Sequence, residues 1–267
     1  MRSDCAVHDA VTRVRRASRL FLGLGALGLA MLAVAAPVQA QAGGARGGGY
    51  LFGVPSGTVT IRTGYDMAFA NSDLFSFVRS ELTVNHSDFS SPTIATDFGF
   101  RLSPRVDAVV GIAYSHSAVE SQFRDWLDNN NLPINQTNEF TRVPLTVNLK
   151  AYLAPRGRAI GHYAWIPAHF APYVGIGAGT MWYKFRQGGD FIDFNTTNVY
   201  SDAYSTSAWT PMADAFVGGD LNINSAMALT AEARYAWAQG PVGGDYSGFH
   251  RLDLSGLAVT AGITFRY

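Results

Sequence analysis

The last eleven residues, Leu257-Ala-Val-Thr-Ala-Gly-Ile-Thr-Phe-Arg-Tyr267, decide the fold. Apolar side chains alternate along them with small or polar ones, and a period of two is the pattern of a strand with one apolar face. The apolar row consists of Leu257, Val259, Ala261, Ile263, Phe265 and Tyr267. We interpret the stretch as the closing strand of a transmembrane β-barrel and its apolar row as the lipid-facing assembly signal.

The composition of the chain fits a membrane barrel better than a cytosolic enzyme. Among the 267 residues, acidic and basic side chains balance at 20 each, so no excess charge points to nucleic acid. Charged residues make up 15% of the chain, against about 25% in soluble domains. Glycine (28 residues) and aromatic residues (13%) are plentiful, as expected for an outer-membrane barrel.

The first 40 residues have the organisation of a secretory signal peptide. A basic region with Arg13, Arg15, Arg16 and Arg19 precedes an apolar run from Leu20 to Ala36. Val38-Gln39-Ala40 then places small residues at the two positions that a signal peptidase reads. We expect residues 1–40 to be removed by cleavage after Ala40, or after Ala42 by the similar motif that ends there.

The mature chain is expected to have two parts. Residues 41–56 form a glycine-rich flexible leader, and residues 57–267 form the barrel domain. Cys5 is the only cysteine and lies in the part removed, so the mature protein has no disulfide and no thiolate metal ligand.

Eight segments of the chain alternate in the manner of half-buried strands. In chain order they cover about Thr58 to Ala68, Thr93 to Leu102, Val106 to Ser117, Glu139 to Leu153, Ala171 to Phe185, Ser207 to Leu221, Ala226 to Trp237 and Leu257 to Tyr267. The fold class that they predict is all-β, a transmembrane antiparallel up-and-down barrel of about eight strands.

The connections between these strands alternate in length. The long, polar ones cover 69–91, 118–138, 186–206 and 239–250. Outer-membrane barrels have long extracellular loops and short periplasmic turns, so this order places both chain ends in the periplasm and requires an even number of strands.

One segment leaves the strand count open. Residues 73–84 form a short helix if Ser72 or Asp73 is the N-cap and Leu74, Phe77, Val78 and Leu82 share one face. They could also form a ninth strand, and a tenth would then be needed to keep the number of strands even. Tyr50 to Pro55 or Asn195 to Tyr204 would then supply it and give ten strands.

Aromatic side chains stand on the apolar face near the strand ends. Two such rows, one at each interface, are typical of barrels in a membrane. The outer row is predicted to contain Tyr65, Tyr114, Trp182, Tyr235 and Trp237.

The polar face of the strands carries charges of both signs. We assign to the barrel interior Arg62, Asp66, Asp97, Arg101, Asp107, Lys150, Asp214, Asp220, Glu232, Arg234 and Arg266. An isolated buried charge is costly, so mixed signs predict mutual pairing, with Arg266 a candidate partner of Asp107 or Asp220. Eight strands leave room for side chains or one small ligand, which favours a salt-bridge plug over a polar conduit.

These features together resemble a known family. The signal peptide, the eight alternating strands and the terminal Ile263-Thr-Phe-Arg-Tyr267 are similar to the small bacterial outer-membrane β-barrel proteins of the opacity-protein, OmpA-type and OmpW-type group. The resemblance covers roughly residues 50–267. It implies location in the outer membrane and recognition by the barrel-assembly machinery, but no single activity.

Catalysis and metal binding have little support. Ser115, His116 and Ser117 form the one tempting cluster, but neighbours on a strand point to opposite faces. The other histidines are scattered over loops and turns, so we expect no catalytic residue, no metal and no cofactor.

The function predicted from the sequence is therefore that of a monomeric outer-membrane barrel. It would contact lipid and act structurally or through its extracellular loops, whose surface ligands the sequence does not name. A narrow channel or carrier for small hydrophobic molecules is the alternative, motivated by the glycine-lined face of the strand 171–185. A lipid-modifying enzyme is the third hypothesis.

Overall fold

The protein separates into two units, Met1–Gly47 and Gly48–Tyr267. The computed structural model describes residues 50–267 except 129–130, 162, 194–195, 197 and 247, all within the second unit. The expected signal peptide and its cleavage sites, Ala40 and Ala42, lie outside the described residues and stay predictions.

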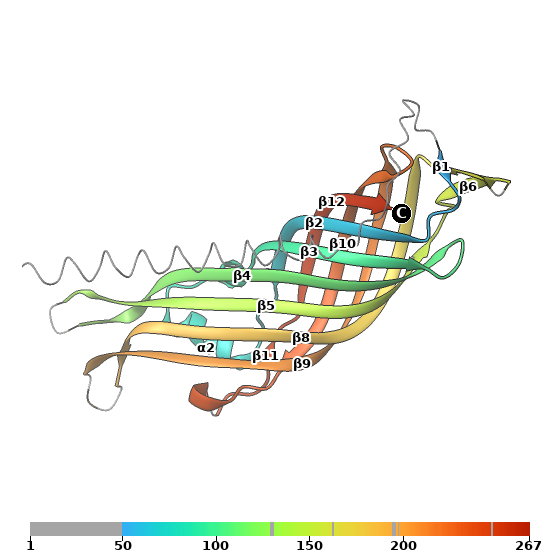
Figure 1. Ribbon diagram of the computed structural model, residues 1–267. Coiled ribbons are helices and arrows are strands. Elements are labelled where there is room, and N and C mark those ends of the chain that lie inside the picture. The colour runs from blue at the N-terminus through green and yellow to red at the C-terminus, as the bar shows by residue number, and fades with distance from the viewer. Residues whose placement is uncertain (1–49, 129–130, 162, 194–195, 197, 247) are drawn as a thin grey trace, which may run out of the picture. The chain divides into compact units, whose positions relative to one another are not determined.

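Eight antiparallel strands close into a ring (Figure 1). They are β2 (Gly57–Ala68), β3 (Ser91–Arg101), β4 (Val106–Leu127), β5 (Pro133–Tyr152), β8 (Phe170–Ile192), β9 (Val199–Asn222), β10 (Met227–Gly240) and β12 (Gly256–Arg266). Each strand pairs with the next one in this order, and β12 pairs with β2 from Gly256 opposite Ala68 to Arg266 opposite Thr58. The predicted up-and-down barrel of eight strands is confirmed.

The strands are staggered around the ring. A row of paired residues that starts at Thr58 passes Gly99, Val109, Asn148, Gly177, Asp214, Ala236 and Gly256 in turn. It returns to β2 at Ala68, ten residues beyond its start (68 − 58 = 10). Such a shear tilts the strands by roughly 35–45° and gives an interior that side chains fill.

Four strands run far beyond their predicted ends. β4, β5, β8 and β9 have 22, 20, 23 and 24 residues, whereas about 9–11 residues cross a bilayer. The prediction that 118–138 and 186–206 are loops was therefore wrong for most of their length. We call the extension the projecting sheet, defined as residues 118–127, 133–141, 184–192 and 199–207; Figure 1 shows these four strands reaching well past β2 and β3.

Short elements close the two ends of the barrel. At one end lie α2 (Asp73–Glu81), the 3₁₀ turns η1 (His86–Phe89) and η2 (Gly244–Tyr246), and β11 (Leu252–Asp253). At the other end β1 (Leu51–Phe52), β6 (Gly157–Ile160) and β7 (Ala164–Pro167) form a separate three-stranded sheet. We call the β6–β7 hairpin the cap hairpin.

The helical interpretation is confirmed for Asp73–Glu81, whereas Leu82 forms an isolated antiparallel bridge with Phe123. The barrel keeps eight strands. The predicted apolar face was wrong in one residue: Phe75 is fully buried, whereas Phe77 is 45% exposed. Two helical turns present two apolar faces here, and only the docking of α2 onto the barrel decides which one is covered.

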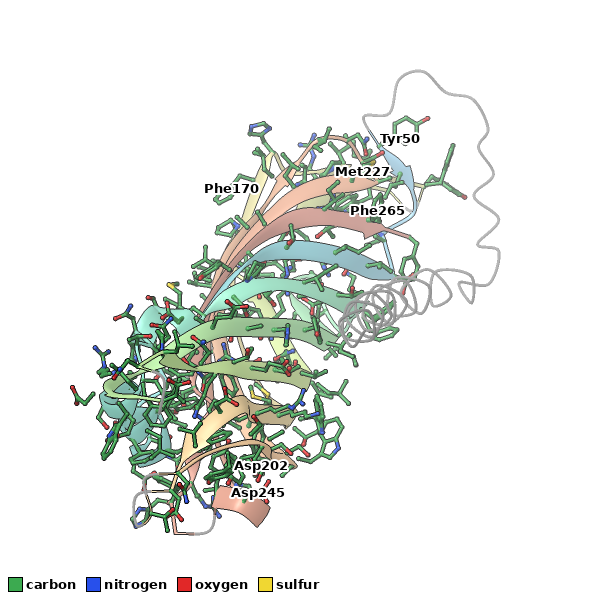
Figure 2. The ribbon with its side chains drawn as sticks, turned by 90° about the vertical axis from the view of Figure 1, so that its left-hand side faces the viewer. Tyr50, Phe170, Asp202, Met227, Asp245 and Phe265 are labelled. Atoms are coloured by element: carbon green, nitrogen blue, oxygen red, sulfur yellow. The ribbon has the colours of Figure 1, made fainter. Side chains whose placement is uncertain are left out.

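The two faces of the barrel wall differ in chemistry. Outward side chains in the middle of the strands are apolar and exposed, for example Ile176, Val147 and Val217. Inward ones such as Asn148, Asp214 and Thr230 are polar and buried. Both ends of the ring can be followed in Figure 2, where Phe170, Met227 and Phe265 lie at one end and Asp202 and Asp245 at the other. In the described residues, no helix is both long and apolar enough to cross a membrane.

Glycine on the inner face of β8 makes room for the interior. A Cβ on Gly175 would lie 2.1–2.7 Å from ring atoms of Phe216, whose ring packs against Tyr173. We expect Gly175→Ala to destabilise the barrel by about 1–3 kcal/mol, because the ring has nowhere to move.

The measurement is urea unfolding of the barrel in lipid vesicles. Gly188→Ala in the same strand is the matched control, since a Cβ there meets nothing nearer than 3.9 Å. Equal stability of the two variants would contradict the packing argument.

Candidate functional site

A layer of ion pairs crosses the middle of the barrel. Arg62 on β2 contacts Asp97 on β3 at 2.5 Å and also Glu232 on β10. Arg234 contacts Asp214 on β9 at 2.6 Å and Glu232 at 3.0 Å. Because each charge is buried beside an opposite one, the layer plugs the barrel, as mixed signs require. The contacts of Arg62 with Asp97 and Glu232 place it in this central layer.

A second group lies next to the central layer. Lys150 is 3.6 Å from Asp220, and its ammonium lies 3.6 Å from the ring centre of Tyr173. The hydroxyl of Tyr152 donates to Asp220, and that of Tyr173 donates to Glu232, both at 3.0 Å. The two tyrosines thus join the lysine group to the central layer.

Two arginines of the interior were missing from the predicted set. Arg142 on β5 contacts Asp66 at 2.8 Å. Its position in the polar row of the fourth predicted strand was a signal that could have found it. Arg156 contacts Asp107 at 2.6 Å but lies between β5 and β6, where no alternation marks a face.

The predicted pairing of Arg266 was wrong. Its guanidinium donates to the side-chain carbonyl of Asn222 and lies 5.6 Å from the ring centre of Trp165. Asp107 forms its ion pair with Arg156 instead, and Asp220 forms its ion pair with Lys150. The cap hairpin causes the difference, because it brings Trp165 and Arg156 to the barrel end that carries Arg266.

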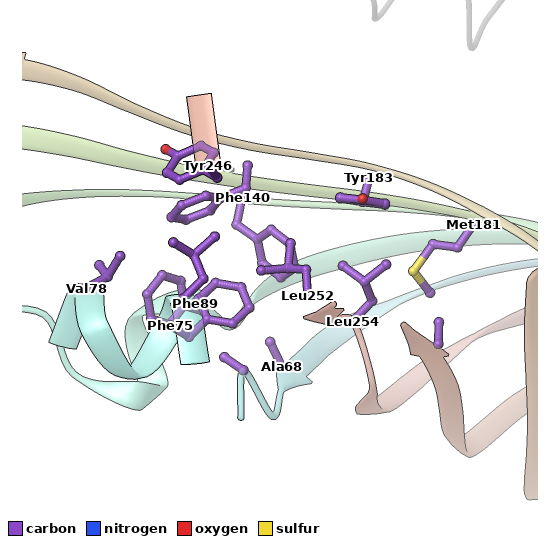
Figure 3. Close-up of a cluster of buried hydrophobic side chains, with 14 of the residues drawn as sticks. Ala68, Phe75, Val78, Phe89, Phe140, Met181, Tyr183, Tyr246, Leu252 and Leu254 are labelled. Carbon is purple, nitrogen blue, oxygen red and sulfur yellow. The ribbon is translucent and has the colours of Figure 1, made fainter. Parts of the chain in front are cut away.

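The opposite end of the barrel is closed by an apolar cluster. Phe75 of α2 packs on Phe89, Phe140 and Phe185 with ring centres 4.6–5.4 Å apart. Figure 3 shows how side chains of α2, of the strands and of the chain around β11 meet there. The buried members are Ala68, Ala70, Leu74, Phe75, Val78, Leu82, Val84, Phe89, Phe140, Met181, Tyr183, Phe185, Met212, Ala238, Tyr246, Leu252 and Leu254.

A cavity of about 70 Å³ separates this cluster from the central ion pairs. Arg62, Asp97 and Glu232 line it from one side, and Met181 and Met212 from the other. A space of that size holds only a few water molecules. The arrangement therefore suits a sealed interior better than a conduit.

A larger cleft lies outside the barrel, between α2 and the projecting sheet. Its volume is about 660 Å³, within the usual range for sites that bind small molecules. Aromatic rings of Phe77, Phe123, Phe191 and Tyr200 line it together with Val78, Leu82 and Ile192. Among the described residues, six polar ones also line it, namely Glu81, Gln136, Gln187, Asp193, Thr196 and Asn198, so the apolar walls meet a polar edge.

A ladder of polar side chains holds the inner face of the projecting sheet in place. Asn138 donates to Ser121 at 2.8 Å, Gln187 donates to Asn138 at 2.9 Å, and Tyr246 donates to Gln187 at 3.1 Å. The ladder links β4, β5 and β8 to η2. It gives the cleft a hydrogen-bonded base.

The predicted aromatic girdle lies on the outer face of the wall. Tyr65, Tyr114 and Trp237 are exposed, and the rings of Tyr235 and Trp237 lie 4.3 Å apart. Trp209 is a further member, and it pairs in register with Trp182. The outward-facing residues of the predicted strand 207–221 have odd numbers, so the sequence could have placed Trp209 in the girdle. The apolar row Leu257 to Tyr267 also faces outward. That these residues mark the interface and guide assembly stays a prediction.

The candidate catalytic cluster is split between the two faces. Ser115 donates to Asp66 inside the barrel at 2.9 Å, whereas His116 contacts Thr141 at 2.9 Å. Elsewhere His250, which the sequence left unassigned, meets Asp73 of α2 at 2.7 Å. Among the described residues, no three histidine, cysteine or acidic side chains gather as metal ligands.

These features define the class of protein. A closed barrel with an apolar exterior and a charged interior satisfies every strand edge and exposes to lipid only what lipid tolerates. The chain is a small integral β-barrel protein of the outer-membrane type.

Comparisons with known proteins agree in fold. No family model matches the chain, and no curated protein matches its sequence. Similar solved structures include Neisserial surface protein A (TM-score 0.43, 10% identity, covering 82% of this chain and 97% of that one). A second is OprG from Pseudomonas aeruginosa, with a TM-score of 0.43 and 13% identity, covering 80% of this chain and 98% of that one. A third is the outer-membrane protease OmpT from Escherichia coli, with a TM-score of 0.36 and 10% identity, covering 81% of this chain and 99% of that one. These likenesses concern the fold alone, and the class rests on the geometry of the barrel itself.

The central layer yields a prediction about stability. We expect Arg62→Leu to cost about 3–5 kcal/mol, because it leaves Asp97 without its partner in a buried site. Unfolding in urea measures the effect. Arg186→Leu is the control: its 3.8 Å pair with Glu139 is exposed to solvent, so its loss changes stability by no more than about 0.5 kcal/mol. Similar values for both variants would refute a buried ion-pair layer.

The contact between Asp73 and His250 predicts a pH dependence outside the membrane. The backbone N–H and the imidazole of His250 lower the pKa of Asp73 below its usual value. A lowered pKa in the folded state stabilises the contact above about pH 4 and loses that contribution as the pH falls through the folded pKa.

Hydrogen exchange of the His250 amide, corrected for the intrinsic rate, should therefore lose protection in acid. Asp73→Asn should remove the acid step, because an amide side chain does not titrate. An unchanged acid step in this variant would assign it to another group.

Proposed function

We propose that the protein is a sealed outer-membrane barrel that acts by recognition at the cell surface. The observation that carries this proposal is the cleft of about 660 Å³ between α2 and the projecting sheet. The ligand class that fits is a small, mainly apolar molecule, or an apolar side chain of a partner, because aromatic rings form much of the cleft wall. The polar lining residues, among them Glu81 and Asp193, offer hydrogen bonds at its edge.

The rigidity of the projecting sheet supports this role. β8 and β9 pair without interruption from Phe170 opposite Leu221 to Ile192 opposite Val199. Beyond Trp182 and Trp209, outward side chains such as Lys184, Ser205 and Ser207 are polar, which suits water rather than lipid. A hydrogen-bonded wall outside the membrane presents its cleft at little cost in conformational entropy.

The interior supports recognition over conduction. The apolar cluster closes one end, the ion-pair layer fills the middle, and Trp165 of the cap hairpin is buried at the other end. We further propose that the protein is a monomer that contacts outer-membrane lipid through its apolar exterior and is inserted by the barrel-assembly machinery. The split of Ser115 from His116 supports a role without catalysis.

Carriage of small hydrophobic molecules is the second candidate. The observation that favours it is continuity: Val78 and Leu82 line the cleft and also belong to the apolar cluster within the barrel mouth. A carrier would need that cluster to open, whereas recognition needs only the cleft.

Titration with indole, followed by amide resonances of the protein in lipid nanodiscs, tests the proposal. We expect saturable shifts at Leu82 and Ile192, and Phe191→Ala should weaken binding about five- to tenfold by removing one ring from the wall. Tyr163→Ala, an exposed aromatic on the cap hairpin, is the control and should bind indole normally.

Shifts that do not saturate, or that Phe191→Ala leaves unchanged, would contradict recognition in the cleft. If the cleft binds indole and cells that lack the protein also take up indole more slowly, the carrier is favoured.

A further inference from the structure

Three arginines meet at the barrel end that carries the cap hairpin. Arg101 is the last residue of β3, Arg266 is the last residue of β12, and Arg156 precedes the cap hairpin. All three line one cavity of about 10 Å³ together with Asp107 and Trp165. Pro55, Gly57 and Thr58 complete the lining.

Two of these arginines are almost completely buried. Arg156 is 7% exposed and Arg266 is 8% exposed. In the part of the chain that the structure describes, Nε of Arg156, Nη1 of Arg266 and Nη1 of Arg101 are buried and have no protein acceptor. A guanidinium N–H is a strong donor, and leaving a buried donor without a hydrogen bond is costly. We therefore expect each of these atoms to find an acceptor from outside the chain.

The charges around the cavity do not balance. Asp107 is the one carboxylate among the lining residues, and Arg156 already holds it at 2.6 Å. The contacts of Arg266 are neutral, namely the amide of Asn222 and the ring of Trp165. Three arginines and one carboxylate therefore line the cavity. Asp220 also acts on Arg266 through its charge but is already paired with Lys150, and an excess of buried positive charge is costly without a counter-ion.

We propose that the Arg101–Arg156–Arg266 cavity binds one small inorganic anion of halide size. A space of about 10 Å³ is close to the size of one water molecule. A halide therefore enters with a small outward shift of the flexible arginine side chains, and larger oxyanions do not fit. Charge-assisted hydrogen bonds from the three guanidinium groups would hold the ion. The site lies at the opposite end of the barrel from the cleft and is independent of the proposed function.

The anion has a structural consequence for the barrel. It ties the ends of β3 and β12, which flank β2 at the closing seam, to the segment that positions the cap hairpin. Arg101 is already fixed there, since its backbone N–H donates to the carbonyl of Ser56 at 3.0 Å. Bound anion should therefore stabilise the seam and the seated cap together.

A water molecule is the competing occupant. Oδ1 of Asp107 is also buried without a donor, and water could donate to it while an anion could not. The excess of positive charge favours the anion. If an anion occupies the cavity, the stability of the protein depends on halide, and if water occupies it, the stability does not.

The first experiment measures the thermal unfolding of the detergent-folded protein in sodium chloride or bromide against sodium gluconate at equal ionic strength. Halide should raise the unfolding temperature by about 2–4 °C in a saturable manner. Arg156→Gln and Arg266→Gln should abolish the rise. Arg158→Gln, which changes an exposed arginine of the cap hairpin, should keep it.

The second experiment needs no variant and remains decisive if the glutamine proteins do not fold. Crystals of the unaltered protein grown in bromide should show an anomalous peak within hydrogen-bond distance of the three guanidinium groups. A rise equal in halide and gluconate, or retained in both glutamine variants, would overturn the proposal in favour of water. So would bromide crystals without a peak in the cavity. A peak without any saturable effect in solution would mean an adventitious ion only.

Discussion

The requirement that every backbone N–H and C=O find a partner within the chain governs this structure. In a bilayer no water is at hand to satisfy a strand edge, so a sheet must close on itself. Closure occurs where β12 pairs with β2, and the pairing row returns ten residues further along β2. The tilt that this shear imposes sets the width of the interior, and the width decides what the interior can contain.

The narrow interior explains the arrangement of charges. Polar side chains must point inward, because the outward face meets lipid, and once inside they must pair with one another. Arg62, Asp97, Glu232 and Arg234 form a connected layer for this reason. Glycine at position 175 belongs to the same solution, since any side chain there would displace the ring of Phe216.

The sequence predicted the membrane-embedded part well and the rest poorly, for one physical reason. A strand between lipid and a polar interior must alternate apolar and polar side chains, so the sequence itself shows this pattern. Farther along β4 and β5 the inner face mixes polar Ser121 and Asn138 with apolar Val119 and Phe123. Polar residues then stand on both faces, the apolar period of two weakens, and residues 118–127 look like a loop. Only pairing with Pro133 and the residues after it makes them a strand. The cap hairpin and Arg156 were missed because short edge elements carry no such pattern.

The sequence by itself determined the barrel, its eight strands, which face of each strand meets lipid and which charges are enclosed, because a period of two records the two environments. Tertiary structure alone decided which charges pair, since partners such as Arg142 and Asp66 or Arg156 and Asp107 lie far apart along the chain. It also decided that Phe75 rather than Phe77 is buried. The cleft exists because α2 docks beside a sheet whose height only interstrand hydrogen bonds specify.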